Sequence, residues 1–168
     1  MDFYIRPVEP RDVMDINGIR RMPGVFENTA GLPSERLQKN EAFIANMGDN
    51  SHAFCALIPD DEGLEHVIAI ASMEICANPR LCHCADMGIM VHADYQGIGI
   101  GSALMETLID LADQWLMLKR LQLTVFVSNE PAIKLYQKFG FEIEGVNRMG
   151  AVRHGAYEDV YMMARIKE

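Results

Sequence analysis

Three glycines stand at alternate positions in the segment QGIGIG, which spans residues 96–101. The segment follows a strand-like run and precedes an amphipathic helical pattern, so it lies at a strand-to-helix junction. A helix N-terminus presents unpaired N–H groups and about half a unit of positive charge. Glycines allow such a backbone to adopt left-handed conformations and to approach a ligand closely. These residue types at this position favour the binding of an anion, most simply a phosphate.

The spacing of the glycines excludes two common phosphate-binding patterns. No Gly-Lys-Ser/Thr follows them, which excludes a P-loop. Gly97, Gly99 and Gly101 are spaced G-x-G-x-G, whereas the dinucleotide fingerprint is G-x-G-x-x-G with an acidic residue after the second strand. The glycines alone leave a flexible turn as the alternative interpretation.

The surrounding pattern predicts the elements that must position this loop. Periodicity and turn residues predict helices over 9–22, 34–47, 102–118 and 129–140, and strands over 3–8, 52–58, 65–75, 83–91 and 120–127, with a final hairpin that turns at 153–156 and ends in a strand over 157–166. Gly88 interrupts the strand 83–91, which is typical of a β-bulge or of a close backbone approach. The order β-α-α-β-β-β-α-β-α-β-β predicts one α/β (α+β) domain over residues 1–168, with a mixed sheet covered by helices.

Composition narrows the class of protein. The chain has 168 residues, 49% hydrophobic and 23% charged, which is typical of a globular domain. Its net charge of −9 argues against a nucleic-acid partner. We expect no membrane partner and a cytoplasmic location, because no apolar run reaches about 18 residues and the N-terminus lacks the apolar core of a secretory signal.

Four cysteines raise the question of a metal site. Cys82 and Cys84 form a C-x-C pair, with Cys76 upstream, whereas structural zinc sites use a C-x₂₋₄-C pair joined to a second ligand pair. We therefore expect no metal, and free thiols in a reducing compartment.

Two segments together resemble the GNAT superfamily of N-acetyltransferases. QGIGIGSAL is similar to the Q/R-x-x-G-x-G/A loop that binds the acetyl-CoA pyrophosphate, with Gln96, Gly99 and Gly101 at the motif positions. NEPAIKLYQKFGFE is similar to the family's N-x-x-A-x-x-L-Y-x-x-x-G-F element and matches it at Asn129, Ala132, Leu135, Tyr136, Gly140 and Phe141. The element order also agrees, so the resemblance covers essentially the whole chain and is closest to bacterial amino-acid and phosphinothricin acetyltransferases. It implies a mostly antiparallel sheet of six to seven strands flanked by about four helices.

The resemblance also implies where acetyl-CoA binds. The strands 83–91 and 120–127 would splay apart, and the backbone of the first would pair with the pantetheine arm. The N–H groups of residues 97–102 would cradle the pyrophosphate, while Asn129 and Lys134 contact the cofactor from the next helix. The implied cofactor-binding residues are Ile89, Met90, Val91, Gln96, Gly97, Ile98, Gly99, Ile100, Gly101, Ser102, Asn129, Lys134 and Tyr136.

The chemistry that the resemblance implies is direct attack of a primary amine on the thioester. Tyr136 occupies the family's general-acid position, where its phenol protonates the CoA thiolate or donates a hydrogen bond to it. A backbone N–H near Met90 or Val91 is the expected oxyanion donor. Asp86 is the expected general base, because many family members carry an acidic residue in this strand. Glu74 or water is the alternative, with His83 and Tyr161 as remoter options.

The acceptor is expected to be chosen by residues 20–36 and 148–161. Four arginines there suit a carboxylate and three apolar side chains suit a pocket: Arg20, Arg21, Arg148 and Arg153, with Met22, Phe26 and Leu32. They favour a small-molecule primary amine, namely a free amino acid or an analogue. The alternatives are a polyamine or aminoglycoside, bound through Glu27, Glu35 and Asp159, and a non-catalytic acyl-CoA-binding module. A homodimer is also expected from the resemblance.

Overall fold

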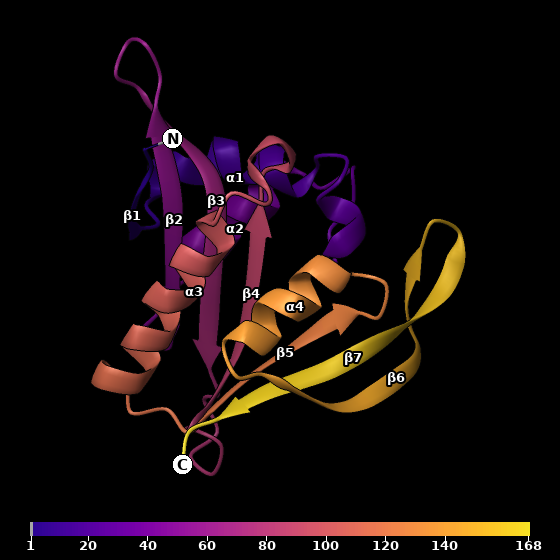
Figure 1. Cartoon of the computed structure of the whole chain (residues 1–168). Coiled ribbons are helices and arrows are strands. Elements are labelled where there is room, and N and C mark those ends of the chain that lie inside the picture. Colours follow the sequence, from indigo (N-terminus) through magenta and orange to yellow (C-terminus); the bar gives the residue numbers. More distant parts are fainter. Residues whose placement is uncertain (1) are drawn as a thin grey trace.

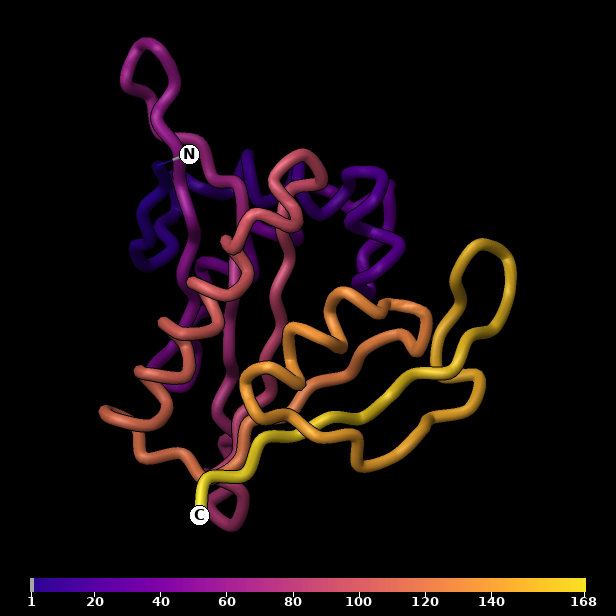
Figure 2. Tube along the Cα trace, viewed as in Figure 1, coloured from indigo at the N-terminus to yellow at the C-terminus, as the bar shows by residue number. Residues whose placement is uncertain are grey.

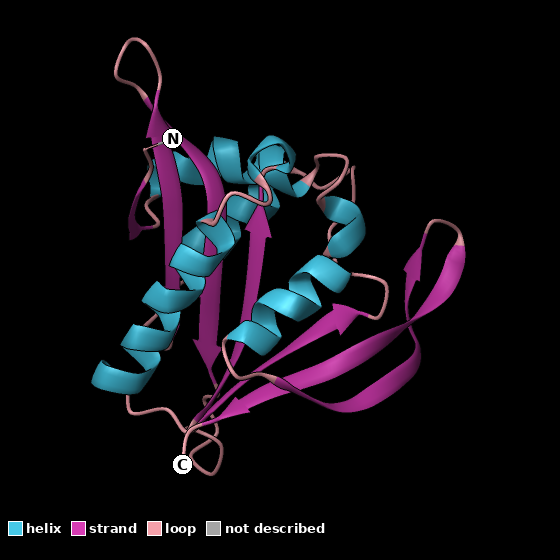
Figure 3. Ribbon diagram, viewed as in Figure 1, coloured by secondary structure: helices cyan, strands magenta, loops and turns pink. Residues whose placement is uncertain are grey.

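The computed structural model describes residues 2–168 and contains one seven-stranded sheet with helices on both faces (Figures 1 and 3). The strand order is β1-β2-β3-β4-β5-β7-β6. The strands are Tyr4–Pro7 (β1), Ser51–Pro59 (β2), Glu65–Ile75 (β3), Cys84–Val91 (β4), Arg120–Phe126 (β5), Glu142–Arg153 (β6) and Ala156–Ile166 (β7). The helices are Val13–Arg20 (α1), Leu37–Ala45 (α2), Ile100–Asp110 (α3) and Glu130–Lys138 (α4). This order of elements confirms the predicted fold.

The helices divide into two layers that bury separate cores. The α3 and α4 helices lie on one face of the sheet, and α1 and α2 lie on the other (Figure 1). Leu104, Met105 and Leu108 on α3 are fully buried in the first core, because their spacing of one, three and four residues places them on the side that faces the sheet. Ile16 and Ile19 of α1 are fully buried in the second core.

The sheet opens between its two central strands. β4 and β5 are parallel and pair only at Cys84–Asp86 with Arg120–Gln122. Beyond this point the strands diverge and divide the sheet into two halves. α3 lies over the half formed by β1–β4, and α4 lies over the half formed by β5–β7 (Figure 1). The backbone edge of β4 from 87 to 91 therefore has no partner strand on its β5 side within the described residues.

The β-bulge expected at Gly88 is wrong. β4 pairs with β3 in one continuous register from Ala85 to Val91, and Gly88 lies directly opposite Ser72. The pairing of β4 with β5 ends at Asp86, while the pairing of β4 with β3 continues without interruption to Val91.

Several element boundaries also differ from the predicted ones. The helix expected over 102–118 begins at Ile100, with Gly99 as its N-cap, and after Asp110 continues as a π-helical turn over Leu111–Trp115. Cys82 lies in a turn before β4, and its thiol is free, as are the three other cysteine thiols.

Within residues 2–168, no group of three His, Cys, Asp or Glu side chains is arranged to hold a metal ion. Over the same residues, none of the helices is both long enough and apolar enough to cross a bilayer.

The C-terminal hairpin extends away from the rest of the molecule (Figure 2). It consists of β6 and β7, and most side chains of β6 are exposed. An ion pair attaches its base to the N-terminal half: Arg165 on β7 donates two hydrogen bonds to Asp113, which follows α3, at 2.9 and 2.8 Å. This contact lies at the closed end of the opening between β4 and β5, where it holds the two halves together.

Candidate active site

A cavity of about 870 Å³ occupies the opening between β4 and β5. Its lining comes from both helical layers, so the cavity passes through the sheet from the α3/α4 face to the α1/α2 face. On the first face it is lined by the glycine loop and the start of α4, and on the second by α1, α2 and the segment between them. Two ligands could therefore enter from opposite faces and meet at the edge of β4.

The glycine loop has the conformation that only glycine adopts readily. Gly97 and Gly99 have φ values of +76° and +95°, in the left-handed region. A Cβ at either position would meet no atom within 4 Å, so open space lies beside the backbone. Gly101 differs, since a Cβ there would lie 3.2 Å from Leu135 Cδ2 on α4. Two glycines therefore supply backbone shape beside open space, and the third permits close packing of α3 against α4.

This loop fits a phosphate group on three counts. Gly99 begins α3, so the unpaired N–H groups of the first turn are at the loop. Ser102 lines the cavity, and Lys138 donates a hydrogen bond to its hydroxyl at 3.3 Å, which brings an ammonium group to the same place. Lys138 is a residue that sequence reasoning missed.

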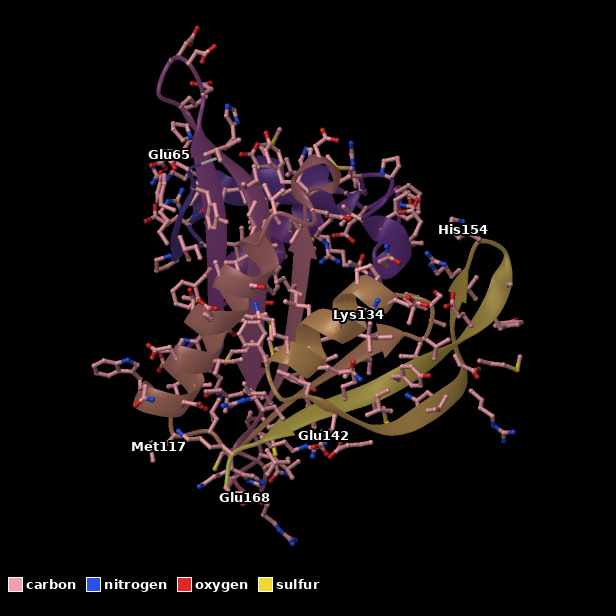
Figure 4. The ribbon with its side chains drawn as sticks, viewed as in Figure 1. Glu65, Met117, Lys134, Glu142, His154 and Glu168 are labelled. Carbon is pink, nitrogen blue, oxygen red and sulfur yellow. The ribbon has the colours of Figure 1, made fainter. Side chains whose placement is uncertain are left out.

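Two other residues implied by the acetyl-CoA resemblance have different surroundings. Lys134 lies outside the cavity lining, on the exposed side of α4, 3.9 Å from Glu130 (Figure 4). Gln96 has a structural contact, because its side-chain amide donates to the Val91 carbonyl at 3.0 Å and to the Gly24 carbonyl at 3.4 Å. Gln96 thus joins the loop to the end of β4.

Tyr136 brings a phenol into the cavity from α4. Its side chain is only 6% exposed and packs against Phe141, with ring centroids 5.8 Å apart. Burial raises the pKa of Tyr136 to about 12. Among the described residues its hydroxyl has no hydrogen-bond partner, so the O–H is available to a ligand. Asn129 also lines the cavity, where its side-chain oxygen caps α4 by accepting the Ala132 N–H.

Asp86 lies beside this cavity rather than in its lining. It lines a smaller cavity of about 150 Å³ together with Glu74, its cross-strand neighbour. The Asp86 carboxylate accepts a hydrogen bond from Gln122 at 2.8 Å, and Glu74 accepts one from the Ser51 hydroxyl. The two cavities share Phe43, Ser72, Met87 and Gly88 in their lining, so they adjoin.

A polar cluster lines the cavity on the α1/α2 face. Arg20 at the end of α1 donates to Glu35 through Nε at 2.5 Å and through Nη2 at 3.3 Å. Asn40 on α2 donates to the same carboxylate at 3.1 Å, and the Lys39 ammonium lies 3.6 Å from it. These hydrogen bonds hold the pKa of Glu35 below its usual range although burial opposes them, so the carboxylate stays ionised at neutral pH.

The structure selects among the residues expected to bind the acceptor. Of the four arginines, Arg20 and Arg153 line the cavity, whereas Arg21 and Arg148 are exposed outside its lining. Met22, Phe26 and Leu32 do not line it, which contradicts the expected apolar pocket. The apolar lining on this side comes instead from Ile16, Val25, Phe43, Ile70 and Met90. Of the three carboxylates expected to bind a cationic acceptor, Glu35 lines the cavity. Glu27 and Asp159 lie outside the lining and accept hydrogen bonds from the backbone N–H groups of Gly24 and Met149.

Arg153 connects the two halves of the molecule across the open end of the cavity. It lies near the tip of the β6–β7 hairpin, beside His154 (Figure 4). Its guanidinium donates to the Glu27 carbonyl at 3.1 Å and to the Asn28 side chain at 3.2 Å. These hydrogen bonds join the β6–β7 hairpin to the segment between α1 and α2 at the edge of the cavity.

Comparisons with known proteins agree with this geometry. Residues 23–141 match the model of the acetyltransferase (GNAT) family. The L-amino acid N-acetyltransferase AaaT of Escherichia coli (strain K12) is 36% identical, over 99% of each chain. A GNAT-family acetyltransferase structure from Streptococcus pneumoniae aligns with a TM-score of 0.83 and 28% identity, over 99% of this chain and 100% of that one. Spermidine N-acetyltransferase from Vibrio cholerae, solved with CoA and spermine, has the same fold, with a TM-score of 0.82 and 23% identity over 98% and 95% of the two chains.

The family match covers most of the chain, and the similarity to the L-amino acid N-acetyltransferase AaaT spans nearly all of it. The glycine loop, the opening between β4 and β5 and the buried tyrosine are the features on which the predicted acetyl-CoA site depended, and they meet in one cavity. The chain therefore belongs to the GNAT family of acetyl-CoA-dependent N-acetyltransferases.

Proposed function

We propose that the protein transfers the acetyl group of acetyl-CoA to the primary amine of a free amino acid or a close analogue. The observation that carries this proposal is the cavity through the sheet, which brings Tyr136 and the glycine loop together with the cluster around Arg20. The acetyl donor enters from the α3/α4 face and the acceptor from the α1/α2 face. The similarity to an L-amino acid N-acetyltransferase over nearly the whole chain supports the choice of acceptor.

The residues of the cavity suit direct attack of the amine on the thioester. Acetyl-CoA supplies an acetyl group that is activated by a thiol leaving group. The N–H groups of residues 97–102 hold the pyrophosphate, and the unpaired edge of β4 supplies an N–H near Met90 or Val91 for the developing oxyanion. As the C–N bond forms and the C–S bond breaks, the thiolate gains a donor in the Tyr136 hydroxyl and the amine loses a proton to a base.

The charge of the cavity favours an amino acid over a polyamine. Its charged lining residues are Arg20, Lys39 and Arg153, which are positive, and Glu35, which is negative, so their sum is +2; Glu158, outside the lining and 3.7 Å from Arg153, offsets one of these charges and leaves the net positive. The whole chain carries −9, and the cavity is thus opposite in sign to the rest of the protein. A net positive lining attracts a carboxylate and repels a polycation. The alternative of a polyamine or aminoglycoside acceptor is therefore less well supported, although the V. cholerae enzyme shares the fold.

A panel of acceptors tests this proposal directly. With acetyl-CoA saturating, CoA release is expected with L-phenylalanine and L-methionine at a kcat/KM at least about 10-fold above that with spermidine or an aminoglycoside, because a charge-assisted pair contributes about 1.5–3 kcal/mol. The opposite ranking would support the polyamine reading. Binding of acetyl-CoA without turnover of any amine would support a non-catalytic acyl-CoA-binding module.

We further propose that Asp86 is the general base and that it acts through water from the smaller cavity. The Asp86→Asn variant is expected to lose about 10-fold in kcat/KM at pH 7. The loss should shrink as the pH rises, since the free amine then needs no base. Glu74→Gln is the matched comparison: a pH-dependent loss in that variant alone would assign the role to Glu74, and no loss in either would assign it to solvent.

The expected homodimer and cytoplasmic location stay predictions. Analytical ultracentrifugation of the purified protein measures the first.

A further inference from the structure

The guanidinium of Arg20 uses only one of its edges inside the protein. It pairs side-on with Glu35, through Nε at 2.5 Å and Nη2 at 3.3 Å. An arginine has five N–H donors in a rigid plane, and this contact occupies two of them. The two N–H groups of Nη1 and one of Nη2 remain, and within the described part of the chain no protein acceptor takes them. Arg20 lines the cavity with its side chain 29% exposed, so these donors are accessible to a ligand there.

Glu35 holds this guanidinium in place. Its side chain is only 3% exposed, and it also accepts from Asn40 at 3.1 Å. The backbone carbonyl of the same residue accepts from Asn17 on α1 at 3.2 Å, so Glu35 contacts α1 through its backbone and both α1 and α2 through its carboxylate. An ionised carboxylate fixed by three side chains cannot turn away, and a fixed partner reduces the freedom that Arg20 would otherwise lose on binding a ligand.

The remaining edge of Arg20 has the geometry of a carboxylate receptor. Nη1 and Nη2 form a fork that pairs bidentately with two carboxylate oxygens. The local cluster of Arg20, Lys39 and Glu35 carries a sum of +1, which leaves one positive charge to be balanced by a ligand. Arg20 belongs to α1, on the face of the sheet opposite the glycine loop and α3, so the phosphates of the acetyl donor are not its natural partners.

We propose that this free edge of Arg20 binds the α-carboxylate of the acceptor, and that Glu35 is the positioning residue that orients it. The inference rests on the proposed function. It adds to that function the protein group that recognises the α-carboxylate, which all amino acids share. Recognition of the carboxylate also places the α-amine at a set distance from Arg20, toward the edge of β4. Apolar residues that line the cavity on the same face as Arg20, including Phe43 and Ile70, leave an apolar space for the substrate's side chain.

The test compares an acid with its amide. kcat/KM is measured for L-phenylalanine and for L-phenylalaninamide with the wild-type protein and with Arg20→Gln, and the acid-to-amide ratio is the readout. The ratio is expected to fall about 30-fold in the variant, which corresponds to about 2 kcal/mol. Dividing variant by wild type for each substrate cancels the difference in amine pKa between them. Arg21→Gln, an adjacent exposed arginine outside the cavity, is the matched control and should keep the wild-type ratio.

Two further variants separate recognition from folding. Arg20→Lys keeps the positive charge but loses the fork, and we expect a ratio lowered about 10-fold, which gives the result if Arg20→Gln does not fold. Glu35→Gln should lower the ratio about 5-fold, and in the double variant with Arg20→Gln it should add no further change in the ratio. If Glu35 had a purely structural role, Glu35→Gln would reduce kcat/KM for both substrates by the same factor.

The outcomes distinguish the two proposals. In one outcome, the wild-type protein acetylates amino acids while Arg20→Gln and Arg20→Lys lower kcat/KM for the acid and for the amide by the same factor. That result overturns the carboxylate assignment, and the proposed function stands. If the wild-type protein turns over neither compound, the proposed function itself fails, and the assignment fails with it.

Discussion

Replacing Tyr136 with phenylalanine is expected to lower kcat about 100-fold and to leave the Kd for acetyl-CoA within about twofold. The substitution removes one hydroxyl and keeps the ring that packs against Phe141 and contributes to the first core. A positioned proton donor contributes about 10²–10⁴-fold to such a step. The hydroxyl has no protein partner among the described residues, so its removal leaves no buried group unsatisfied and should not destabilise the fold.

The buried position of Tyr136 determines what kind of donor it is. Its pKa of about 12 lies above the ordinary value of a thiol, which disfavours complete proton transfer from the phenol to the thiolate. A hydrogen bond to the developing thiolate has no such cost, so we expect the phenol to stabilise the leaving group mainly by donating. Because the raised pKa keeps the phenol protonated well above neutral pH, no loss of kcat from its ionisation is expected below about pH 11.

A tyrosine elsewhere provides the control. Tyr157 on β7 is 68% exposed and lies outside the cavity, so Tyr157→Phe should keep the wild-type kcat. Stopped-flow or steady-state measurement of CoA release reads kcat, and calorimetry reads the affinity for acetyl-CoA. An unchanged kcat in Tyr136→Phe would remove the donor role, and a parallel loss of cofactor binding would reassign the residue to holding the cofactor.

The glycine loop could be predicted from the sequence because its shape depends on backbone, whereas its assignment to acetyl-CoA depends on the resemblance to the GNAT superfamily. Three glycines in six residues are costly in a strand or a helix, and Gly97 and Gly99 have positive φ values that other residues adopt only with strain. The order of the elements follows from apolar periodicity, which is a property of neighbouring residues. Both kinds of information are local in the sequence.

The acceptor half could not be predicted to the same extent, because it depends on where distant side chains point. Arg20 and Arg21 are adjacent and alike in the sequence, yet only Arg20 lines the cavity. The sequence predicts Glu35 only as a partner for a cationic acceptor, whereas the structure pairs it with Arg20, 15 residues away along the chain. No periodicity identifies such a contact before α1 and α2 are placed together.

The expected bulge at Gly88 and the placement of Asp86 illustrate the same limit. A glycine in a strand is consistent with several local geometries, and here the register is continuous. Asp86 is predicted as the general base because many family members carry an acidic residue in this strand, but pairing of β4 with β5 persists to that residue and the larger cavity opens only beyond it. The point at which two strands separate is set by packing of the whole sheet.

Replacing Gly99 with valine is expected to weaken acetyl-CoA binding about 100-fold. Gly99 has a φ of +95° at the N-cap of α3, and a side chain there would extend into the open space beside the loop. Valine would occupy the space that the pyrophosphate needs and would displace the N–H groups of the first turn. Losing one or two charge-assisted hydrogen bonds at about 1.5–3 kcal/mol each gives a loss of this size.

The chain contains a control that separates strain from ligand contact. Gly63 in the turn between β2 and β3 has a φ of +81°, and a Cβ there would also meet no atom within 4 Å. Gly63→Val therefore carries a similar conformational cost, about 1–2 kcal/mol or more for a branched side chain, at a position outside the cavity. Both variants should lose comparable stability in urea unfolding, while only Gly99→Val should lose affinity for acetyl-CoA in calorimetry. Equal affinity in the two variants would mean that the loop does not contact the pyrophosphate, and the positive φ at Gly99 would then serve only to begin the helix.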